Sequence, residues 1–581
     1  MKKTTITFFL AGILCSAGLK AQTLQEGINH LYADRFKSAI GIFEKLVAAN
    51  PNNIEATYWL GQAYFEMDEY AGTRLAAVRD LYSKALQTSA NAPLLQVGMG
   101  HLDLREGKTT EARQKFEAAI TATRTRKGDD PIILNAIGRA NVDAKQGDLA
   151  YAIQMLEEAV KKDDKNPDVY LNLGNAYRKA RPGEGGGQAY QNYNKALAVS
   201  PTFARAYVRL AALFEAQKNW ELMLENLNKS VEVDPKFTKG YYELFYYYWF
   251  LKKDYPQAEA QLNKYIQSKV PETDIQDQYM YAQLCYGKKD YDCAITKAQS
   301  VVNALGEKSK PKIYRLLAYA NYDKGNYAEA LKNSNIFFEK KNPSDLKVTA
   351  DGDNPIVNDY KLRADILAKT GGTPDDILQT YLAGAAMDTV MTSKVDILKQ
   401  GAKIFKDMKM RDKEVILLDE IMKVKPKPTM NDYFDLTTAN YFSGNYARSR
   451  ETALKMQELY PTEIYGFVWA FNSSRAVDTV KKDSIAVPDA LKLYEFTAKD
   501  TTKNRKDYIT AVSYLAGYYI NDAKDKEKSL EFFLKWQEAD VANAAKIQEY
   551  IDQIKKMDTP KPGSVPKGSP GAKSGSPGPK R

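Results

Sequence analysis

The sequence predicts an all-α protein built from stacked helical hairpins. One motif recurs at equal intervals of about 36 residues, as Lys-Asp-Tyr at 253–255 and 289–291 and as Gly-Asn-Tyr at 325–327. An alanine follows each tyrosine three positions later. A period of about 34–36 residues is typical of hairpin arrays, in which neighbouring hairpins bury each other's apolar faces. The chain of 581 residues therefore needs no single large core.

The pattern continues on both sides of these three copies. Leu-Gly-x-x-Tyr occurs at 60–64 and 173–177, Ala-x-x-x-Phe at 39–43 and 112–116, and Gly-Asn-Tyr-Ala at 444–447. These motifs resemble the tetratricopeptide repeat (TPR) family. The resemblance implies a right-handed TPR superhelix, an α-solenoid of about fourteen hairpins with a C-terminal capping helix.

Composition and pattern divide the chain into five segments. They are a signal peptide at 1–21, an N-terminal TPR array at 22–343, a linker at 344–355, a divergent C-terminal TPR array with the capping helix at 356–557, and a disordered basic tail at 558–581. The tail is rich in Pro, Gly, Ser and Lys and has almost no apolar residues, so it cannot build a core.

The first residues resemble a secretory signal. Lys2 and Lys3 precede a short apolar run, and a small-residue cleavage site is expected before Gln22. The ending Lys-Ala-Gln resembles exported proteins of Bacteroidetes-type bacteria. We expect a periplasmic protein, with outer-membrane association or secretion as alternatives. Lipidation at Cys15 is a rival interpretation, although the residues before it depart from the usual lipobox.

The formal charge of +10 overstates how basic the repeats are. Much of the excess lies in the signal segment and the tail, so the repeat body is close to neutral and lacks the footprint of a nucleic-acid binder. The chain has only two histidines, and no catalytic, metal-ligand or phosphate-loop motif is present. The sequence thus predicts no enzyme, no catalytic residue, no cofactor and no metal site.

Two cysteines remain after the signal segment, Cys285 and Cys293. They flank the turn of one predicted hairpin, and in an oxidising compartment such a pair forms a disulfide that clamps the hairpin. The alternative is two free thiols, because spacing alone does not give the Cβ directions.

An unusual aromatic run covers residues 241–250. Aromatic side chains occupy nearly every face of this predicted helix. One interpretation is dense packing against both neighbouring helices. The other is an aromatic patch, with Tyr242 and Tyr246, that receives a peptide or glycan.

The TPR resemblance also suggests a carboxylate clamp. Some TPR domains hold a peptide's C-terminal carboxylate with Lys, Asn and Arg side chains on successive first helices. Aligning the fourth to sixth repeats places candidate contacts at four such positions: Asn141, Asn172, Arg205 and Arg209. Ile137 stands where the family has Lys. Solvated arginines on an ordinary surface are the alternative.

The leading hypothesis is therefore a non-enzymatic scaffold or assembly factor of the cell envelope, which holds a partner peptide or helix in its concave groove. The alternative is a glycan- or peptidoglycan-binding protein. It would use the aromatic run as a platform and the basic tail to contact anionic wall or membrane surfaces.

Overall fold

The computed structural model describes residues 23–67, 73–272, 274–275, 277–340, 353–478 and 484–557. Regular structure in these residues is helical, apart from one antiparallel bridge between Thr125 and Gly128. The predicted all-α class is thus confirmed. The predicted signal peptide, the tail and most of the linker lie outside the described residues. Among the helices that are described, none is both long and apolar enough to cross a bilayer.

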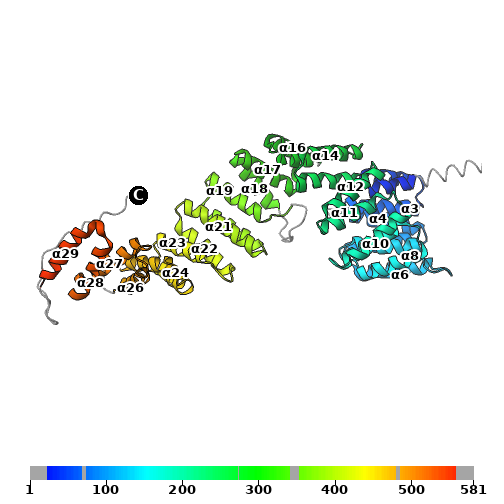
Figure 1. The fold of residues 1–581 in the computed structure, drawn as a ribbon. Coiled ribbons are helices and arrows are strands. Elements are labelled where there is room, and N and C mark those ends of the chain that lie inside the picture. Colours follow the sequence, from blue (N-terminus) through cyan, green and yellow to red (C-terminus); the bar gives the residue numbers. More distant parts are fainter. Residues whose placement is uncertain are drawn as a thin grey trace, which may run out of the picture. The chain divides into compact units, whose positions relative to one another are not determined.

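The chain forms two compact units, Met1–Lys324 and Gly325–Arg581. The first unit begins with a helix over 23–32 and continues with α2 (Phe36–Ala49), α3 (Ile54–Met67), α4 (Thr73–Thr88), α5 (Pro93–Arg105), α6 (Thr109–Thr123), α7 (Pro131–Asp143), α8 (Leu149–Lys162), α9 (Pro167–Ala180), α10 (Gly186–Val199), α11 (Ala204–Ala216), α12 (Trp220–Val233), α13 (Thr238–Tyr246), the π-helix η1 (Tyr247–Lys252), α14 (Tyr255–Lys269), α15 (Asp277–Gly287), α16 (Tyr291–Leu305), η2 (Gly306–Lys308) and α17 (Pro311–Lys324). Consecutive helices pack as hairpins, which Figure 1 shows in chain order.

The second unit repeats the hairpin plan. It contains α18 (Tyr327–Lys340), α19 (Val357–Thr370), α20 (Pro374–Met387), α21 (Met391–Asp407), α22 (Arg411–Val424), α23 (Met430–Phe442), α24 (Tyr446–Leu459), α25 (Tyr465–Val477), α26 (Ala486–Thr497), α27 (Arg505–Asn521), α28 (Lys526–Ala539), η3 (Val541–Asn543) and α29 (Ala544–Lys556). Helix α29 closes the unit by burying Ile547, Ile551 and Ile554.

The recurring tyrosine motif marks the start of the second helix in a hairpin. Tyr255 and Tyr291 are the first residues of α14 and α16. Two residues earlier, Lys253 and Lys289 adopt left-handed backbone with φ of 54° and 62°. A left-handed residue ends a helix by turning the chain away from its axis. Between the two, an aspartate accepts a hydrogen bond from a backbone N–H of the new helix, which caps it.

Close packing inside each hairpin explains the glycines of the repeat. A Cβ at Gly174 in α9 would overlap the ring of Tyr193 in α10, and a Cβ at Gly61 in α3 would overlap the ring of Tyr82 in α4. Both tyrosines are completely buried. A small residue on the first helix therefore makes room for a large one on the second.

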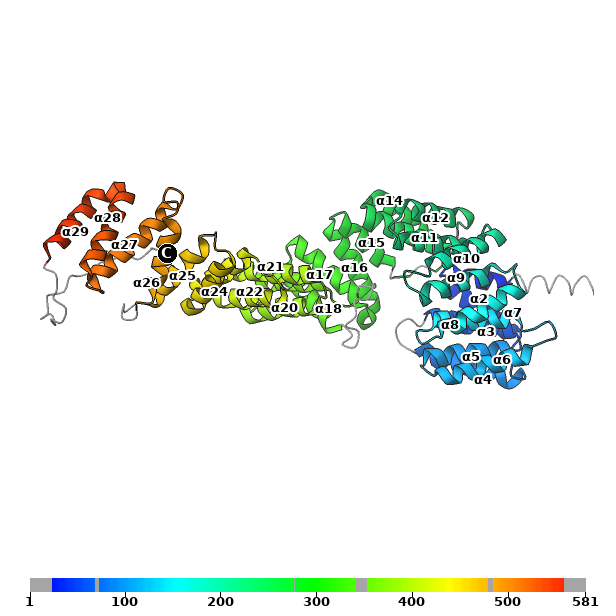
Figure 2. The ribbon, with the colours of Figure 1, turned by 60° about the horizontal axis from the view of Figure 1, so that its bottom comes forward.

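The first hairpin also contacts a helix far along the sequence. Thr238 Oγ1 at the start of α13 donates a hydrogen bond to the carbonyl oxygen of Ala33. The backbone N–H groups of Lys37 and Ser38, at the start of α2, donate to the two carboxylate oxygens of Glu272. In Figure 2 the blue first hairpin lies among the cyan and green helices of the same unit. The first unit thus closes into one turn.

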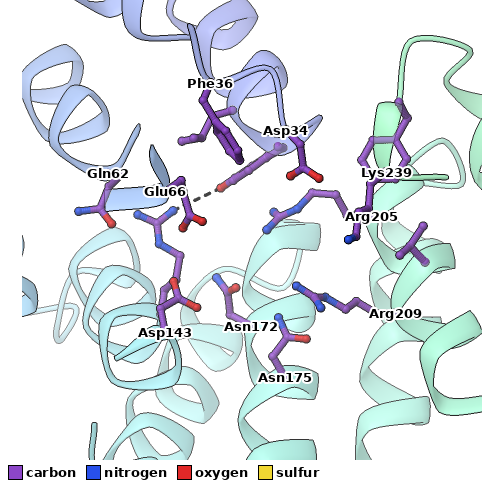
Figure 3. Close-up of a pocket in the computed structure, with 15 residues that line it drawn as sticks. Asp34, Phe36, Gln62, Glu66, Asp143, Asn172, Asn175, Arg205, Arg209 and Lys239 are labelled. Atoms are coloured by element: carbon purple, nitrogen blue, oxygen red, sulfur yellow. Dashed lines mark hydrogen bonds between the residues drawn. The ribbon is translucent and has the colours of Figure 1, made fainter. Parts of the chain in front are cut away.

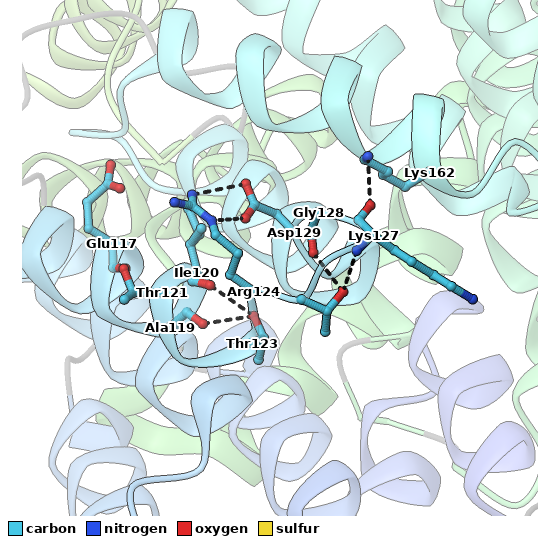
Figure 4. A network of polar contacts seen from close by, with 11 residues as sticks. Glu117, Ala119, Ile120, Thr121, Thr123, Arg124, Lys127, Gly128, Asp129 and Lys162 are labelled. Carbon is cyan, nitrogen blue, oxygen red and sulfur yellow. Dashed lines mark hydrogen bonds and ion pairs between the residues drawn. The ribbon is translucent and has the colours of Figure 1, made fainter.

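The loop between α6 and α7 is held by polar contacts of two cations. After α6, Arg124 Nε donates to Asp129 Oδ1 at 2.6 Å, and Thr125 and Gly128 bond each other through their backbones. Lys162 Nζ then donates to the carbonyl oxygen of Lys127 at 3.0 Å (Figure 4). Arg124 in the loop and Lys162 at the end of α8 thus each have an acceptor.

Candidate functional site

Closure of the first unit encloses a cavity of about 240 Å³. First helices of several hairpins contribute side chains to it, including α3, α7, α9, α11 and α13, together with the turn before α2 (Figure 3). The lining residues that carry charge or an amide are Asp34, Gln62, Glu66, Arg139, Asp143, Asn172, Asn175, Arg205, Arg209 and Lys239. The cavity is thus predominantly polar.

The carboxylates that line the cavity, here called the acidic wall, are Asp34, Glu66 and Asp143, of which Asp34 lies nearest to Arg205 and Lys239 (Figure 3). Asp34 occupies the left-handed position of the first hairpin turn, with φ of 58°, a conformation that aspartate tolerates better than most residues. Glu66 lies in the last turn of α3, and Asp143 is the last residue of α7. None of the three carboxylates forms a hydrogen bond or ion pair with a residue that the structure describes.

The basic wall consists of Arg205, Arg209 and Lys239. Arg205 and Arg209 lie one turn apart at the start of α11, and Lys239 is the second residue of α13. Figure 3 shows the three cations across the cavity from Glu66 and Asp143.

The cations of the basic wall are not equivalent. Arg205 Nη1 lies 2.7 Å from Asp168 Oδ1, and its guanidinium is 3.5 Å from the ring centroid of Tyr32. Lys239 Nζ lies 3.0 Å from Glu243 Oε1. Arg209 has no hydrogen bond or ion pair to any described residue. Among the described residues, it is therefore the cation of this wall whose charge has no protein partner.

Three of the unpaired groups have pKa values that are shifted by their surroundings. The surrounding protein raises the pKa of Asp34 by desolvation, although its side chain remains open to solvent. Desolvation, followed by the charge of Asp143, likewise raises the pKa of Glu66. Desolvation and then the nearby Arg205 lower the pKa of Arg209. Each of these groups is therefore less stable in its charged form than it would be in water.

Helix dipoles act in the same direction. Glu66 and Asp143 sit at helix C-termini, where the dipole disfavours a negative charge, and Arg205 and Lys239 sit at N-termini, where it disfavours a positive one. The opposite arrangement would stabilise each helix by about 0.3–1 kcal/mol per charge. The positions of these four charges are therefore unfavourable for the stability of their own helices.

The structure brings together three of the four residues predicted for a clamp. Asn172, Arg205 and Arg209 all line the cavity. The structure does not place Asn141, the fourth predicted residue, at this cavity, because its buried side chain spans the turn after α7. There its amide donates to the carbonyl oxygen of Ile137 and accepts from the backbone N–H of Asp148. Asn141 therefore stabilises the hairpin and does not line this cavity.

Asn172 has partners of its own. Its Nδ2 donates to Asn135 Oδ1 at 2.9 Å and to Asp168 Oδ2 at 3.1 Å. Arg205 binds the other oxygen of Asp168. Burial would raise the pKa of Asp168, but the charges of Arg205 and Arg139 outweigh it and hold the pKa below its usual range. Asp168 is therefore an ionised anchor behind the cavity.

Most residues of the cavity carry no recognisable sequence signal. Asp34, Glu66, Asp143 and Lys239 belong to no motif and come from distant repeats. Arg139 is also new, and it is largely buried: its Nη2 donates to Tyr58 Oη at 2.8 Å, and its guanidinium lies 4.4 Å from the ring centroid of Trp59. The only available signal was the placement of Asp34 in a turn where other copies have Gly or Lys.

The aromatic run is mainly a packing element. Phe245 is completely buried, and the ring of Tyr242 lies 4.8 Å from that of Tyr246. Tyr246 Oη donates to Gln283 Oε1 at 3.1 Å, and Trp249 Nε1 donates to the carbonyl oxygen of Gln283 at 2.9 Å. Tyr242 and Tyr246 thus pack at the junction of α13 with α14 and α15, half-buried.

A π-helix in the second half of the run was not foreseen. From Tyr247 to Lys252 the backbone widens to π geometry, which is rare in helices. It leaves Phe250 67 % exposed.

Cys285 and Cys293 are joined by a disulfide, with their Cα atoms 5.7 Å apart. The bond links α15 to α16 across the hairpin turn. Within the described ranges, no group of three or more His, Cys, Asp and Glu side chains is arranged to hold a metal ion.

Two stretches match known repeat families. Residues 24–93 match the model described as "Tetratricopeptide repeat", and residues 140–180 match "TPR repeat". This chain contains tetratricopeptide repeats. TPR arrays offer extended concave binding surfaces, so protein–protein interaction is the general role that the repeats support.

Solved structures of TPR proteins are similar to parts of the chain. The C-terminal part of a TPR repeat-containing protein from Cytophaga hutchinsonii is 24% identical over 48% of this chain and 100% of that chain, with a TM-score of 0.28. A tetratricopeptide repeat protein from Parabacteroides merdae is 19% identical over 47% of this chain and 98% of that one, with a TM-score of 0.36.

Proposed function

We propose that this TPR protein is a non-enzymatic scaffold or assembly factor of the cell envelope. Its cavity between Asp34 and Lys239 receives an exposed segment of a partner protein. The observation that carries the proposal is Arg209, a cation without a protein partner in a cavity lined by first helices. A guanidinium of this kind binds a carboxylate through two parallel hydrogen bonds. The resemblance of the chain's first residues to an export signal supports the periplasm as the compartment.

Site-specific crosslinking in the native host tests the groove. A photoreactive residue would replace Asn175, which lines the cavity, and in a control protein it would replace Glu111, an exposed residue at the start of α6. We expect a partner crosslinked from position 175 and not from position 111. Combining position 175 with Arg209→Glu should abolish the adduct, and Arg209→Lys should retain part of it.

Two results would contradict this proposal. The first is the same set of adducts at both positions. The second is an adduct at position 175 that survives Arg209→Glu in a protein whose circular dichroism and melting temperature are unchanged. Compartment is tested separately by osmotic-shock fractionation, where retention of the protein with cytoplasmic markers would refute the envelope assignment.

A further inference from the structure

The two walls of the cavity have opposite charge and come from different parts of the closed turn. The acidic wall is supplied by the first, second and fourth hairpins, through Asp34, Glu66 and Asp143. The basic wall is supplied by the sixth and seventh hairpins, through α11 and α13. The cavity is therefore bipolar, and it exists only because the first hairpin closes onto α13.

The opposite charges do not satisfy each other within the protein. No ion pair between the described residues joins the acidic wall to the basic wall, because Arg205 is paired with Asp168 and Lys239 with Glu243. Elsewhere on the same unit, a similar cation such as Arg124 has a carboxylate partner at 2.6 Å (Figure 4). Arg209 and the three carboxylates are thus open toward the same space.

We propose that this cavity recognises a residue that carries a cation and a carboxylate together, namely the C-terminal lysine or arginine of a partner peptide. The free α-carboxylate pairs with the guanidinium of Arg209. The side-chain cation lies against Glu66 and Asp143, with Asp34 adding negative potential. This inference rests on the proposed function and names the chemistry of the segment that is bound.

Size and charge both restrict the ligand. The cavity of about 240 Å³ equals the volume of about eight water molecules at ~30 Å³ each, which suits one long side chain with its terminal carboxylate. A peptide ending in an acidic residue would place its side-chain carboxylate against the acidic wall, where like charges repel each other. An internal lysine would leave Arg209 without its carboxylate.

A bipolar ligand would also tie the second and fourth hairpins to the sixth, and the second and sixth are the hairpins next to the closure. Its carboxylate binds α11, and its cation binds α3 and α7. Binding should then protect the contacts between the first hairpin and α13, including the amides of Lys37 and Ser38 that donate to Glu272. Slower hydrogen exchange at these two amides would report this bridging independently of affinity.

Calorimetric titration of the intact protein with short synthetic peptides tests the proposal. The probe is N-acetyl-Gly-Ser-Gly-Gly-Lys with a free C-terminus. Two matched peptides carry either a C-terminal amide or norleucine in place of lysine, and free L-lysine is a fourth ligand. We expect the amide and the norleucine peptide each to bind at least 10-fold more weakly than the probe. Binding of L-lysine as tight as the probe would assign the same chemistry to a free amino acid.

Variants assign each end of the ligand to its wall. Arg209→Gln should bind the free acid and the amide equally, while still preferring lysine to norleucine. The double variant Glu66→Gln with Asp143→Asn should bind the lysine and norleucine peptides equally, while still preferring the free acid to the amide. Glu111→Gln, on the outer surface, is the matched control and should bind as the unmodified protein does. Equal binding of lysine and norleucine peptides by the unmodified protein, or no binding of the probe, overturns the inference.

The outcomes separate this inference from the proposed function. If crosslinking from position 175 depends on Arg209 but the lysine peptide does not bind, the scaffold proposal stands and the bipolar ligand is wrong. If the crosslinks are also indifferent to Arg209, both proposals fail.

Discussion

The charged cavity and the aromatic run at 241–250 were both candidate binding regions, and they differ in how their side chains are satisfied. In the aromatic run, rings pack on rings, and the hydroxyl of Tyr246 and the indole N–H of Trp249 each donate to Gln283. In the cavity, Arg209 and three carboxylates have no protein partner among the described residues.

The difference shows that an unusual composition is a weaker sign of a binding site than charged side chains that have no protein partner. A cluster of aromatic residues lowers the free energy of the fold by burying apolar surface. Charges that are desolvated, unpaired and set against helix dipoles raise it. Packing therefore accounts for the first pattern, whereas the second leaves charged side chains available to a ligand.

The largest expected effect on stability comes from replacing a buried ring of the aromatic run. Phe245→Ala should lower the free energy of unfolding by about 3–5 kcal/mol, because the deletion leaves a cavity among packed rings. Phe250→Ala, whose side chain is 67 % exposed, should change it by less than about 0.5 kcal/mol. Urea unfolding followed by tryptophan fluorescence measures both. Similar costs at the two positions would show that the run is not a packed core.

The two arginines of α11 should behave oppositely. Arg205→Gln should lower the free energy of unfolding by about 1–3 kcal/mol, because it leaves the half-buried carboxylate of Asp168 without its ion pair. The lowered pKa of Asp168 contributes stability that is lost as the pH falls through that pKa, so the difference between the variant and the unmodified protein should be largest near pH 7 and should shrink at acidic pH. Arg209→Gln should be neutral or stabilising. Chemical denaturation at several pH values compares them, and a cost at Arg209 equal to that at Arg205 would mean that Arg209 has a structural partner.

A smaller effect is expected at the hydroxyl of Tyr246. Tyr246→Phe removes the hydrogen bond to Gln283 and should cost about 0.5–1.5 kcal/mol. Peptide binding at the cavity should not change. If the substitution instead abolished binding of an oligosaccharide or peptide without altering stability, the aromatic run would be a site after all.

The smallest expected effect on stability comes from a substitution in the acidic wall. The raised pKa of Glu66 means that the folded protein holds more protons than the unfolded chain between the ordinary carboxyl value of ~4.3 and the raised value, so stability falls as the pH rises through that window. Glu66→Gln removes this contribution and should raise the melting temperature at pH 7 by no more than about 2 °C, because solvent screens an exposed group. Scanning calorimetry between pH 4 and 7, with Glu111→Gln as control, detects it. A lower melting temperature at pH 7 would indicate a hidden stabilising partner.

Local rules account for the parts of the fold that could be predicted. The 36-residue interval reflects a turn in which a left-handed residue, a capping residue and a tyrosine follow one another, and each of these is set by neighbours in the chain. The glycine opposite a large ring, as at Gly174 and Tyr193, also lies within one hairpin. The sequence alone therefore determined the class of fold and where its helices begin.

Only the tertiary structure decided the site. Asp34 and Lys239 lie in different hairpins, and they line one cavity because the first hairpin bonds to α13 and to Glu272. That closure depends on small rotations accumulated over many hairpins, which no local pattern encodes. The same closure placed Arg209 at the cavity, whereas the side chain of Asn141 is held by local hydrogen bonds within its own hairpin.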